Sequence, residues 1–516
     1  MKRVSILNHV IGPIMRGPSS SHTAGPWRIG RVSRDLLGSR PISARFLIHP
    51  SSSLSVCYHD QGSDLALLAG LLDIPLPDER FPHLLRLAPE MGLEARFELA
   101  PFPEADHPNS LFLFLQGENG KEVSLHARSV GGGSIEIASV DGHPVMIRGD
   151  RHELLVETGM ETPVDSLLAL LQSWDPSARQ AVGASSRLFH ASACEEPGEP
   201  LLKSLYCLSG NAIIRQSRPV MPPLKGAELF QDTPGLLQLA EQNGWSLGKA
   251  ALANEEALLG GPRQELSREM ELRLDVMLNA VESGLSLTGG MKLLRPVASS
   301  ILAAESKGHL FLGGPHLRAA ARAMAAMHVN GAGGVVCAAP TGGSAGVLPG
   351  ILSTLILDFG LSKEKALDAL WAAGAIGQAL DRLSTFAAEV CGCQVEIGAA
   401  GAMGAAAVIE AAGGTARQAC DAAATVFQNI MGSVCDLVQG IVEVPCHSRN
   451  AALASMAFLC ADMVLGGYEN PVPLDETLVA VDSVGRMLPE ELRCTARGGL
   501  ALCPSARAMR RLDIQE

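Results

Sequence analysis

Aromatic residues are scarce in this sequence. They make up 4% of the 516 residues, whereas 54 residues are glycine. Charged residues are also few, at 18%, against 47% hydrophobic residues. A chain with this balance can bury a large core and does not have the composition of a disordered protein. Small residues in place of aromatic ones indicate closely packed helices and tight turns, and the length predicts two to four domains.

The sequence also has no excess of positive charge and no long uninterrupted apolar run. The net charge is −13 and no dense stripe of Lys and Arg occurs, which argues against a nucleic-acid partner. The apolar stretches 344–359 and 451–467 are interrupted by Pro349 and Asp462. Both fall short of the roughly 18 uninterrupted apolar residues that indicate a membrane span. We therefore expect two buried helices and no membrane partner.

The opening of the chain does not have the pattern of a secretory signal. Met1-Lys2-Arg3 is basic, but Asn8 and His9 interrupt the apolar run that follows. In a chain of this size, the 12 cysteines then predict free thiols in a reducing cytosol rather than a disulfide framework. The expected location is cytoplasmic.

Three cysteines stand beside residues typical of helix ends and turns, namely Cys393, Cys435 and Cys446. Thiolates are soft ligands that suit zinc, copper(I) and iron–sulfur clusters. Three protein ligands leave one position at which a metal can bind a substrate. The alternative is that these cysteines pack in the core as small hydrophobic residues, as free cysteines often do.

Two segments rich in hydroxyl groups precede stretches with helical patterns. The first, from Gly17 to Pro26, contains Ser19, Ser20, Ser21, His22 and Thr23, and the second contains Thr341 and Ser344. One Ser or Thr is enough to cap a helix, so capping is the simplest interpretation of each segment. A loop of this kind at a helix N-terminus can also bind an anion such as a carboxylate. Arg449 and Asn450, just after Cys446, could orient a carboxylate as well.

Several motifs together resemble those of the iron–sulfur L-serine dehydratases. They are G-C-Q-V-E-I-G-A-A-G-A-M at 392–403, C-D-L-V-Q-G at 435–440, V-E-V-P-C-x-x-R-N at 442–450, G-P-S-S-S-H-T at 17–23 and S-V-G-G-G-x-I-E-I at 129–137. The resemblance implies that Cys393, Cys435 and Cys446 hold a [4Fe–4S] cluster whose fourth iron is left for substrate, with no matching role for Cys391. It also places the substrate carboxylate at the loop of Ser19, Ser20, Ser21, His22 and Thr23. Asn109, Thr341, Ser344, Arg449 and Asn450 become candidate substrate-binding residues.

The sequence departs from the family pattern where the general base is expected. The family has H-G-T-D, with its histidine as the favoured base, whereas this chain has Gln61-Gly62-Ser63-Asp64. A glutamine cannot remove a proton as an imidazole can at neutral pH. We consider His59 and His22 as alternatives, because a strand over 54–59, if it extends further, would place His59 and Gln61 on one face.

Two further departures lie near the C-terminal motifs. Relatives often have P-C-I-E-R-N at the third cysteine, whereas His447 and Ser448 follow Cys446 here. In some relatives a terminal cysteine can reach the open iron. Cys503, in the segment that resembles the family's T-x-x-G-G-L-A ending, lies thirteen residues before the end. The same role for Cys503 is therefore doubtful.

The pattern of apolar residues predicts an α+β protein in three parts. Residues 1–148 are expected to form a mixed α/β domain, with strands near 42–49, 54–59, 95–99, 110–116 and 122–128. Residues 149–222 are expected to form a small ACT-like regulatory module or a plain connecting domain, with an extended segment at 204–209. Residues 223–516 are expected to form a large all-α catalytic domain, because their apolar spacing is helical.

The sequence thus predicts a lyase that converts L-serine to pyruvate and ammonia by cluster-dependent β-elimination, in amino-acid degradation or gluconeogenesis. The alternatives are a lyase for a related β-hydroxy or β-thiol acid and a sensor that keeps the cluster without catalysis. The resemblance also implies a homodimer that acts on a small amino acid.

Overall fold

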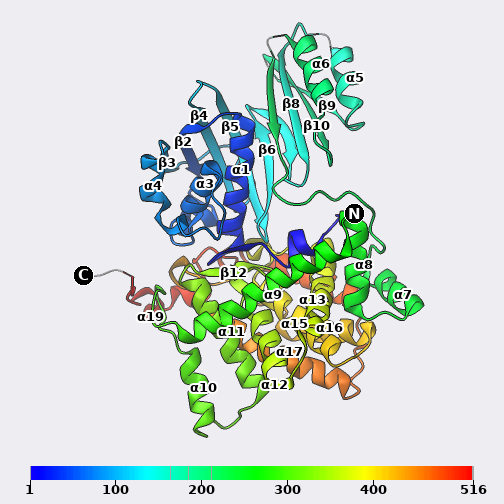
Figure 1. The fold of residues 1–516 in the computed structure, drawn as a ribbon. Helices are drawn as coiled ribbons and strands as arrows, with labels where there is room; N and C mark the ends of the chain where they lie inside the picture. Colours follow the sequence, from blue (N-terminus) through cyan, green and yellow to red (C-terminus); the bar gives the residue numbers. More distant parts are fainter. Residues whose placement is uncertain (1, 163, 184, 211, 514–516) are drawn as a thin grey trace. The chain divides into compact units, whose positions relative to one another are not determined.

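The computed structural model describes residues 2–162, 164–183, 185–210 and 212–513, and its ribbon is drawn in Figure 1. The chain divides into two compact units. The first, here called the helical unit, contains residues 1–24, 131–133 and 226–516. The second, here called the mixed unit, contains residues 25–130 and 134–225. The first 24 residues thus fold with the C-terminal helices, and the boundary predicted near residue 148 remains a prediction.

The mixed unit contains a six-stranded sheet whose strand order is β3-β2-β4-β5-β6-β7. The strands are β2 (Pro41–Ile48), β3 (Glu94–Leu99), β4 (Ser110–Gly117), β5 (Glu122–Gly131), β6 (Ser134–Val140) and β7 (His143–Ile147). β2 pairs parallel with β3 and antiparallel with β4. The helices α1 (Gly25–Leu37), α3 (Ser63–Leu72) and α4 (Leu84–Glu90) lie beside this sheet (Figure 1). α1 and α3 pack tightly, because Gly30 and Gly70 let the two backbones approach each other.

A second sheet in the mixed unit has four strands in the order β11-β8-β10-β9. Its elements are β8 (His152–Gly159), α5 (Val164–Gln172), β9 (Arg179–Val182), β10 (Ser186–Ala193), α6 (Glu199–Ser209) and β11 (Ile213–Ser217). This β-α-β-β-α-β order is the ferredoxin-like arrangement. Leu154, Val156, Phe189 and Leu205 are in its core, which joins the sheet to both helices. The ACT-like identity and a regulatory role of this part both stay predictions.

Two predicted strands of the mixed unit are wrong. Residues 54–59 do not form a strand, because Ser52 accepts a hydrogen bond from the Ser55 backbone and begins the short helix α2 (Ser53–Cys57). The argument that alternation puts His59 and Gln61 on one face therefore fails. Residues 204–209 belong to α6, in which Leu205 is fully buried. A short apolar segment could not be assigned to helix or strand by its pattern alone.

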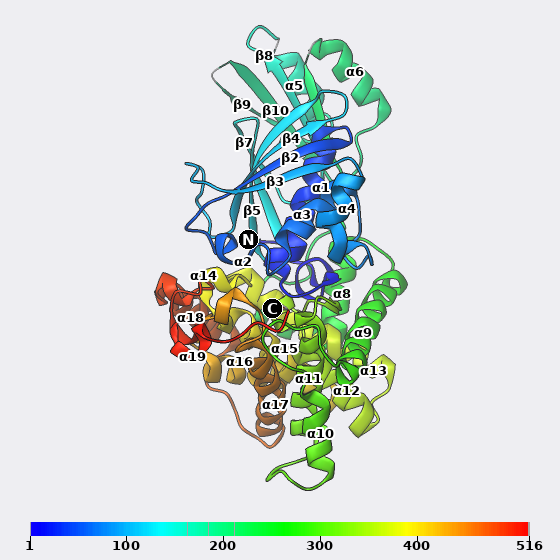
Figure 2. The same ribbon diagram turned by 90° about the vertical axis from the view of Figure 1, so that its left-hand side faces the viewer.

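The helical unit is built around α15 (Ile397–Ala411), which packs against α13 (Lys363–Leu383), α16 (Ala416–Ile430) and α17 (Cys446–Leu465) (Figure 2). The other long helices are α7 (Thr233–Asn243), α8 (Leu247–Leu259), α9 (Arg263–Ser286), α10 (Ala298–Ser306), α11 (Pro315–Gly331), α12 (Val347–Phe359) and α18 (Leu474–Met487). Added Cβ atoms at Gly401 and Gly404 would lie 2.5 and 2.3 Å from neighbouring side chains. Small residues on α15 therefore allow the close helix packing that the composition predicts, and the α+β class is confirmed.

One segment in the described part of the chain, 342–359, is long and apolar enough to cross a membrane, and 78% of it is buried inside the protein. A core helix passes the same test, so the segment is weak evidence for a span.

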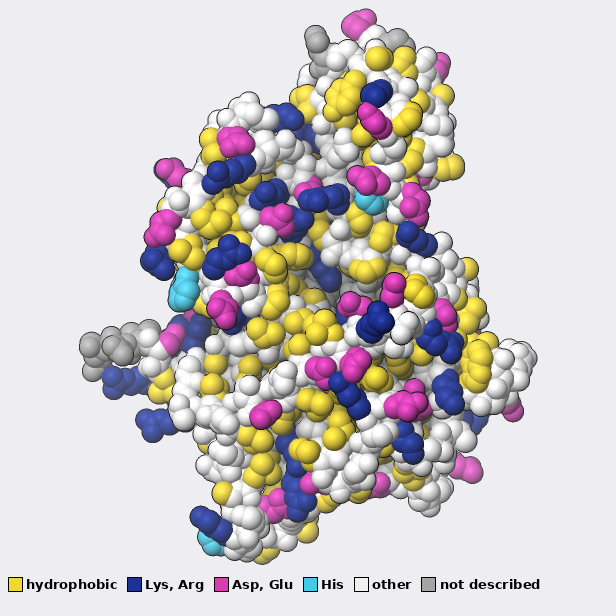
Figure 3. All heavy atoms as spheres, viewed as in Figure 1, with side chains coloured by type: hydrophobic (Ala, Val, Ile, Leu, Met, Phe, Trp, Pro, Cys, Tyr) yellow, Lys and Arg dark blue, Asp and Glu magenta, His cyan; other side chains and the backbone are white. Residues whose placement is uncertain are grey.

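β12 (Val335–Cys337) pairs with β1 (Ile14–Arg16) within the helical unit. On the face drawn in Figure 3, basic and acidic side chains are interspersed, without a basic stripe.

Candidate active site

The predicted hydroxyl loop forms a buried network in the helical unit. Residues 20–24 form a π-helical turn, a rare conformation that is frequent at functional sites. The Nδ1 atom of His22 lies 2.9 Å from the Ser21 hydroxyl and 3.3 Å from the Ser19 hydroxyl. Ser21 donates a hydrogen bond of 2.8 Å to Glu389. Burial lowers the pKa of His22, and the nearby Glu389 opposes this shift only in part, so the imidazole is neutral at physiological pH.

The second hydroxyl segment contacts the first one. The backbone N–H of Gly342 donates to the Ser20 hydroxyl at 3.3 Å. Thr341 and Ser344 form a reciprocal capping box on the 3₁₀ turn at Gly342–Ser344, whereas α12 begins after Gly346 without a side-chain cap. The Thr341 hydroxyl also lies 2.6 Å from a carboxylate oxygen of Glu396 and donates a hydrogen bond to it. Thr341 therefore caps the turn and also takes part in a polar site.

The three predicted ligand cysteines lie in the same part of the helical unit. Cys393, Cys435 and Cys446 are each no more than 2% exposed. Hydrogen bonds with the thiols of Cys393 and Cys494 raise the pKa of Cys435 well above its usual value. Burial, together with the nearby Cys393, raises that of Cys446. Neighbouring thiols thus disfavour ionisation of Cys435 and Cys446, whereas a bound metal would favour it because metals bind thiolates.

Cys494 belongs to this group, and the sequence analysis missed it. Its backbone N–H donates to the Cys435 carbonyl at 2.9 Å, and the Cys435 N–H donates to Leu492 at 2.8 Å. This pairing brings the C-terminal segment alongside Cys435. The neighbouring Asp436 accepts a hydrogen bond from the Leu500 backbone at 2.9 Å. The T-x-x-G-G-L-A motif at 495–501 therefore has a structural role. The position of Cys494 directly before this motif was the sequence signal for that cysteine.

The basic and amide residues after Cys446 are engaged by the protein itself. Arg449 donates to Asp436 and to the Val434 carbonyl, both at 2.9 Å, and one of its nitrogens lies 3.7 Å from the Cys393 sulfur. Asn450 is fully buried. Its amide nitrogen donates to the carbonyls of Gly343 and Cys446, and its oxygen accepts from the Gly346 backbone. Both residues thus hold the site segments together, and their contact with substrate stays a prediction.

The three buried thiols are donors of the kind that iron–sulfur clusters use. Within the described residues, no three His, Cys, Asp or Glu side chains are arranged around one ion. A cluster has several irons, and each cysteine binds a different one, so its ligands need not converge on one point. The buried thiols and the adjacent Arg449 provide soft donors and a compensating positive charge. Cys503 instead packs beside the apolar cluster of Leu293, Val438 and Ile441.

Three predicted site residues lie in the mixed unit, and each is described there by itself. Gln61 is 1% exposed and follows α2 in a turn. The His59 side chain is 68% exposed, and its ring nitrogen lies 2.6 Å from Asp64. Asn109 is fully buried just before β4. His59 and Gln61 therefore differ in environment, which gives no support to His59 as a substitute at the position of Gln61.

Two carboxylates, the buried Glu389 and the partly exposed Glu396, were not selected from the sequence. Glu389 lies on the short helix α14 (Ala388–Cys391) and accepts from Ser21. Glu396 lies where a 3₁₀ turn meets α15, with φ −111° and ψ −81°. Burial raises the pKa of Glu396 to about 7. The quoted motif at 392–403 contained Glu396, but nothing in the sequence showed that it approaches the hydroxyl segments.

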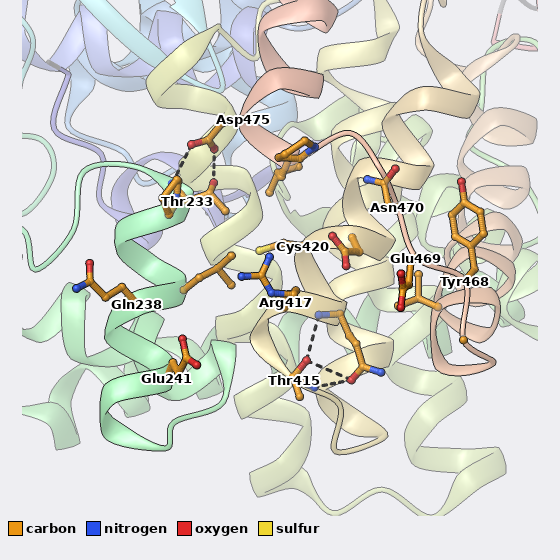
Figure 4. Close-up of a pocket in the computed structure, with 18 residues that line it drawn as sticks. Thr233, Gln238, Glu241, Thr415, Arg417, Cys420, Tyr468, Glu469, Asn470 and Asp475 are labelled. Atoms are coloured by element: carbon orange, nitrogen blue, oxygen red, sulfur yellow. Dashed lines mark hydrogen bonds between the residues drawn. The ribbon is translucent and has the colours of Figure 1, made fainter.

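A separate pocket of about 750 Å³ lies on the helical unit between α7, α16 and the segment before α18 (Figure 4). Thr233, Arg417 and Tyr468 are among its lining residues. Its cysteine, Cys420, is buried, and burial raises the pKa of this thiol to about 12. Cys420 therefore remains a neutral thiol, and the pocket contains no counterpart of the cysteine group above.

Comparisons with known proteins agree with the motifs. The family model "Serine dehydratase alpha chain" matches residues 242–501. The alpha chain of a probable L-serine dehydratase from Bacillus subtilis is 36% identical over 282 residues, which cover 54% of this chain and 94% of that protein. The beta chain from the same organism is 38% identical over 156 residues, which cover 30% and 69%.

A relative with both parts in one chain covers nearly the whole sequence. The L-serine dehydratase of Haemophilus influenzae is 31% identical over 508 residues, which cover 94% of this chain and 96% of that protein. Segments similar to separate alpha and beta chains thus occur here in one polypeptide. The chain belongs to the L-serine dehydratase family, in the form that joins the beta and alpha parts.

Proposed function

We propose that this protein is an L-serine ammonia-lyase that forms pyruvate and ammonia by β-elimination, with a [4Fe–4S] cluster held by Cys393, Cys435 and Cys446. The observation that carries the proposal is the meeting of the cysteine segments with the two hydroxyl segments in the helical unit. Asn450 bonds to both Cys446 and Gly343, and Gly342 bonds to Ser20. Family membership supports the same activity.

The hydroxyl loop is suited to hold the substrate carboxylate. The hydroxyls of Ser19 and Ser20 can donate to a carboxylate, and they lie beside Ser21, whose own proton goes to Glu389. The neutral His22 adds no charge of its own, and its Nδ1 atom lies near the hydroxyls of Ser19 and Ser21 and so restrains them. Donors that are already fixed need little reorganisation when a carboxylate binds.

The residues around the cysteines would orient the substrate and exclude water. When bound, the cluster supplies a Lewis-acidic iron that makes the β-hydroxyl a better leaving group. Arg449 offsets the negative charge of the thiolates, and Asn450 fixes the 343–346 backbone next to them. The enamine product of water loss tautomerises and hydrolyses in solution to pyruvate and ammonia.

A substrate panel under strictly anaerobic conditions tests the proposal. The protein is reconstituted with iron and sulfide and assayed for α-keto acid with L-serine, D-serine, L-threonine and L-cysteine. We expect L-serine to be the best substrate by at least tenfold in kcat/KM. A preference for L-cysteine or another acid would assign the site to a different lyase, and no turnover with any of them would favour a sensor.

We also propose that the protein works as a cytoplasmic homodimer in amino-acid degradation. The 12 cysteines form no disulfide among the residues that the structure describes, which suits a reducing compartment. Light scattering of the anaerobic protein at several concentrations tests the dimer, and a mass of one chain would contradict it.

A further inference from the structure

We propose that Glu396 is the general base that removes the α-proton of the substrate. This inference rests on the proposed dehydration of L-serine and deepens it, because it assigns the proton acceptor to the helical unit. Its basis is the position of one carboxylate among the segments that form the site, together with the environments of the other candidates.

Glu396 lies at the point where the site segments meet. Its carboxylate accepts a hydrogen bond of 2.6 Å from Thr341. The backbone of Gly343 passes so close that an added Cβ atom would lie 2.6 Å from the same carboxylate. The Thr341–Ser344 turn in turn contacts the hydroxyl loop through the Gly342–Ser20 hydrogen bond. A substrate held by that loop is therefore near the Glu396 carboxylate.

Partial exposure to solvent distinguishes Glu396 from its neighbours in sequence. All residues from 391 to 400 are buried except Glu396, which is partly exposed. The residue interrupts the helical path between Val395 and Ile397, because its φ and ψ angles are not helical. A base must lie next to the proton that it removes, and the hydrogen bond from Thr341 holds this carboxylate beside the hydroxyl segments.

The other titratable groups of the site are less suited to this task. Glu389 accepts from Ser21 and lies 3.6 Å from His22, so it positions the hydroxyl loop. His22 is 1% exposed, and its Nδ1 atom lies against two serine hydroxyls. Gln61 has no basic group, and His59 is bonded to Asp64 at an exposed position. Glu396 remains as the carboxylate that is bonded to the second hydroxyl segment.

The chemistry balances with groups that the proposed reaction already contains. The Cα–H bond breaks as an O–H bond forms on Glu396. The electron pair of the C–H bond becomes the Cα–Cβ double bond, and the Cβ–O pair leaves with the hydroxyl oxygen. The leaving hydroxide takes a proton and departs as water, which regenerates the carboxylate. A carboxylate is a common general base, and Glu396 ends the cycle in the form in which it began.

Glu396→Gln tests the proposal in the reconstituted full-length protein. Glutamine keeps the size and an oxygen acceptor for Thr341 but cannot take the proton. We expect kcat to fall about 10²- to 10⁴-fold, the usual contribution of a general base. Iron and sulfide content, the cluster absorbance and the calorimetric Kd for L-serine should stay within twofold of the wild type.

Glu410→Gln is the matched control. Glu410 lies on the same helix, α15, and burial raises its carboxyl pKa too, but it accepts from Gly248. Its substitution should leave kcat within twofold. The proposal is overturned if Glu396→Gln keeps more than a tenth of the activity, or if it loses cluster or serine binding in proportion to activity. An inactive wild type with a full cluster would refute the proposed function itself, and the base with it.

Discussion

A guanidinium nitrogen of Arg449 lies 3.7 Å from the sulfur of Cys393, and Asp436 holds the same side chain at 2.9 Å. Arg449 follows the third predicted ligand by three residues, and Asp436 follows the second directly. The ion pair between Arg449 and Asp436 thus joins the third and second cysteine segments, and the contact with Cys393 joins the first. This relationship predicts that the charge at Arg449 stabilises the cysteine site more than it stabilises the fold.

Arg449→Met is expected to reduce iron retention. The substitution leaves Asp436 buried without its ion-pair partner, which costs about 1–3 kcal/mol after allowance for the 25% exposure of the Arg449 side chain. Iron and sulfide per chain are measured after anaerobic gel filtration. Arg417→Met, on α16 and outside the cysteine group, is the control and should keep its iron. Equal iron in both variants would show that Arg449 does not support the site.

Cys446→Ala is expected to abolish the cluster without unfolding the protein. The residue begins α17 at the third predicted ligand position. Iron per chain and the absorbance near 400 nm should fall to background, while far-ultraviolet circular dichroism is unchanged. The control is Cys420→Ala, which removes a buried thiol from the pocket in Figure 4 and should keep the cluster. A full cluster in Cys446→Ala would assign this cysteine to core packing.

Activity is expected to rise with pH through about 7. Burial raises the pKa of Glu396 in the free protein to about 7, and the base is active only when deprotonated, so kcat/KM increases from about pH 5.5 and levels off near about pH 8.5. The Thr341 hydroxyl stabilises the charged form of Glu396. Thr341→Val should therefore move the rising part of the pH–activity curve to higher pH. Thr341→Ser keeps the hydroxyl and should leave the curve near its wild-type position. A curve that does not move in Thr341→Val would contradict the role of Thr341.

Gly343→Ala is expected to impair catalysis more than stability. An added Cβ atom would lie 2.6 Å from the Glu396 carboxylate, so the flexible end of that side chain must move. We expect kcat to fall at least tenfold, with a loss of unfolding free energy of less than about 2 kcal/mol. Gly289→Ala is the control, because nothing lies within 4 Å of its added Cβ atom. The account predicts no change there, and similar kinetic losses in both variants would argue against it.

The four-stranded sheet of the mixed unit should become less stable as pH rises from about 4.5 to 7. Burial raises the pKa of Glu153 to about 7, although His190 lies 2.7 Å away. The folded state then binds more protons than the unfolded state in this range, so its stabilisation is present at low pH and is lost as pH rises through 7. Glu153→Gln should remove this dependence and stabilise the sheet at pH 8 by about 1–3 kcal/mol.

Hydrogen exchange of the β8 and β10 amides at pH 5 and pH 8 measures this effect locally. Glu157→Gln, on the same strand and bonded to Ser186 at 2.7 Å, is the control. Unchanged exchange in Glu153→Gln at pH 8 would show that the buried carboxyl does not destabilise the sheet.

Sequence reasoning predicted the long elements and the cysteine segments well, for physical reasons. The helical character of 223–516 and the strands observed at 110–117 and 122–131 follow clear apolar patterns that tertiary contacts did not override. The predictions at 54–59 and 204–209 were wrong, because short apolar runs fit both helix and strand. In the first case, the side chain of Ser52 begins a helix.

The contacts of the site could be predicted only in part. Cys393, Cys435 and Cys446 were found through motif resemblance, whereas Cys494 depends on a backbone pairing between distant segments. Glu396 was inside a quoted motif, but its hydrogen bond to Thr341 joins residues that are 55 positions apart. Periodicity carries no information about such long-range contacts.

The central claim is that three cysteines hold a cluster that is required for serine dehydration. The most direct test is a titration of the anaerobic apoprotein with iron and sulfide, in which cluster content and pyruvate formation are measured on the same samples. The account predicts a rate that rises in proportion to cluster content and levels off at one [4Fe–4S] per chain. Pyruvate formed at the same rate without iron, or a full cluster without pyruvate, would contradict it.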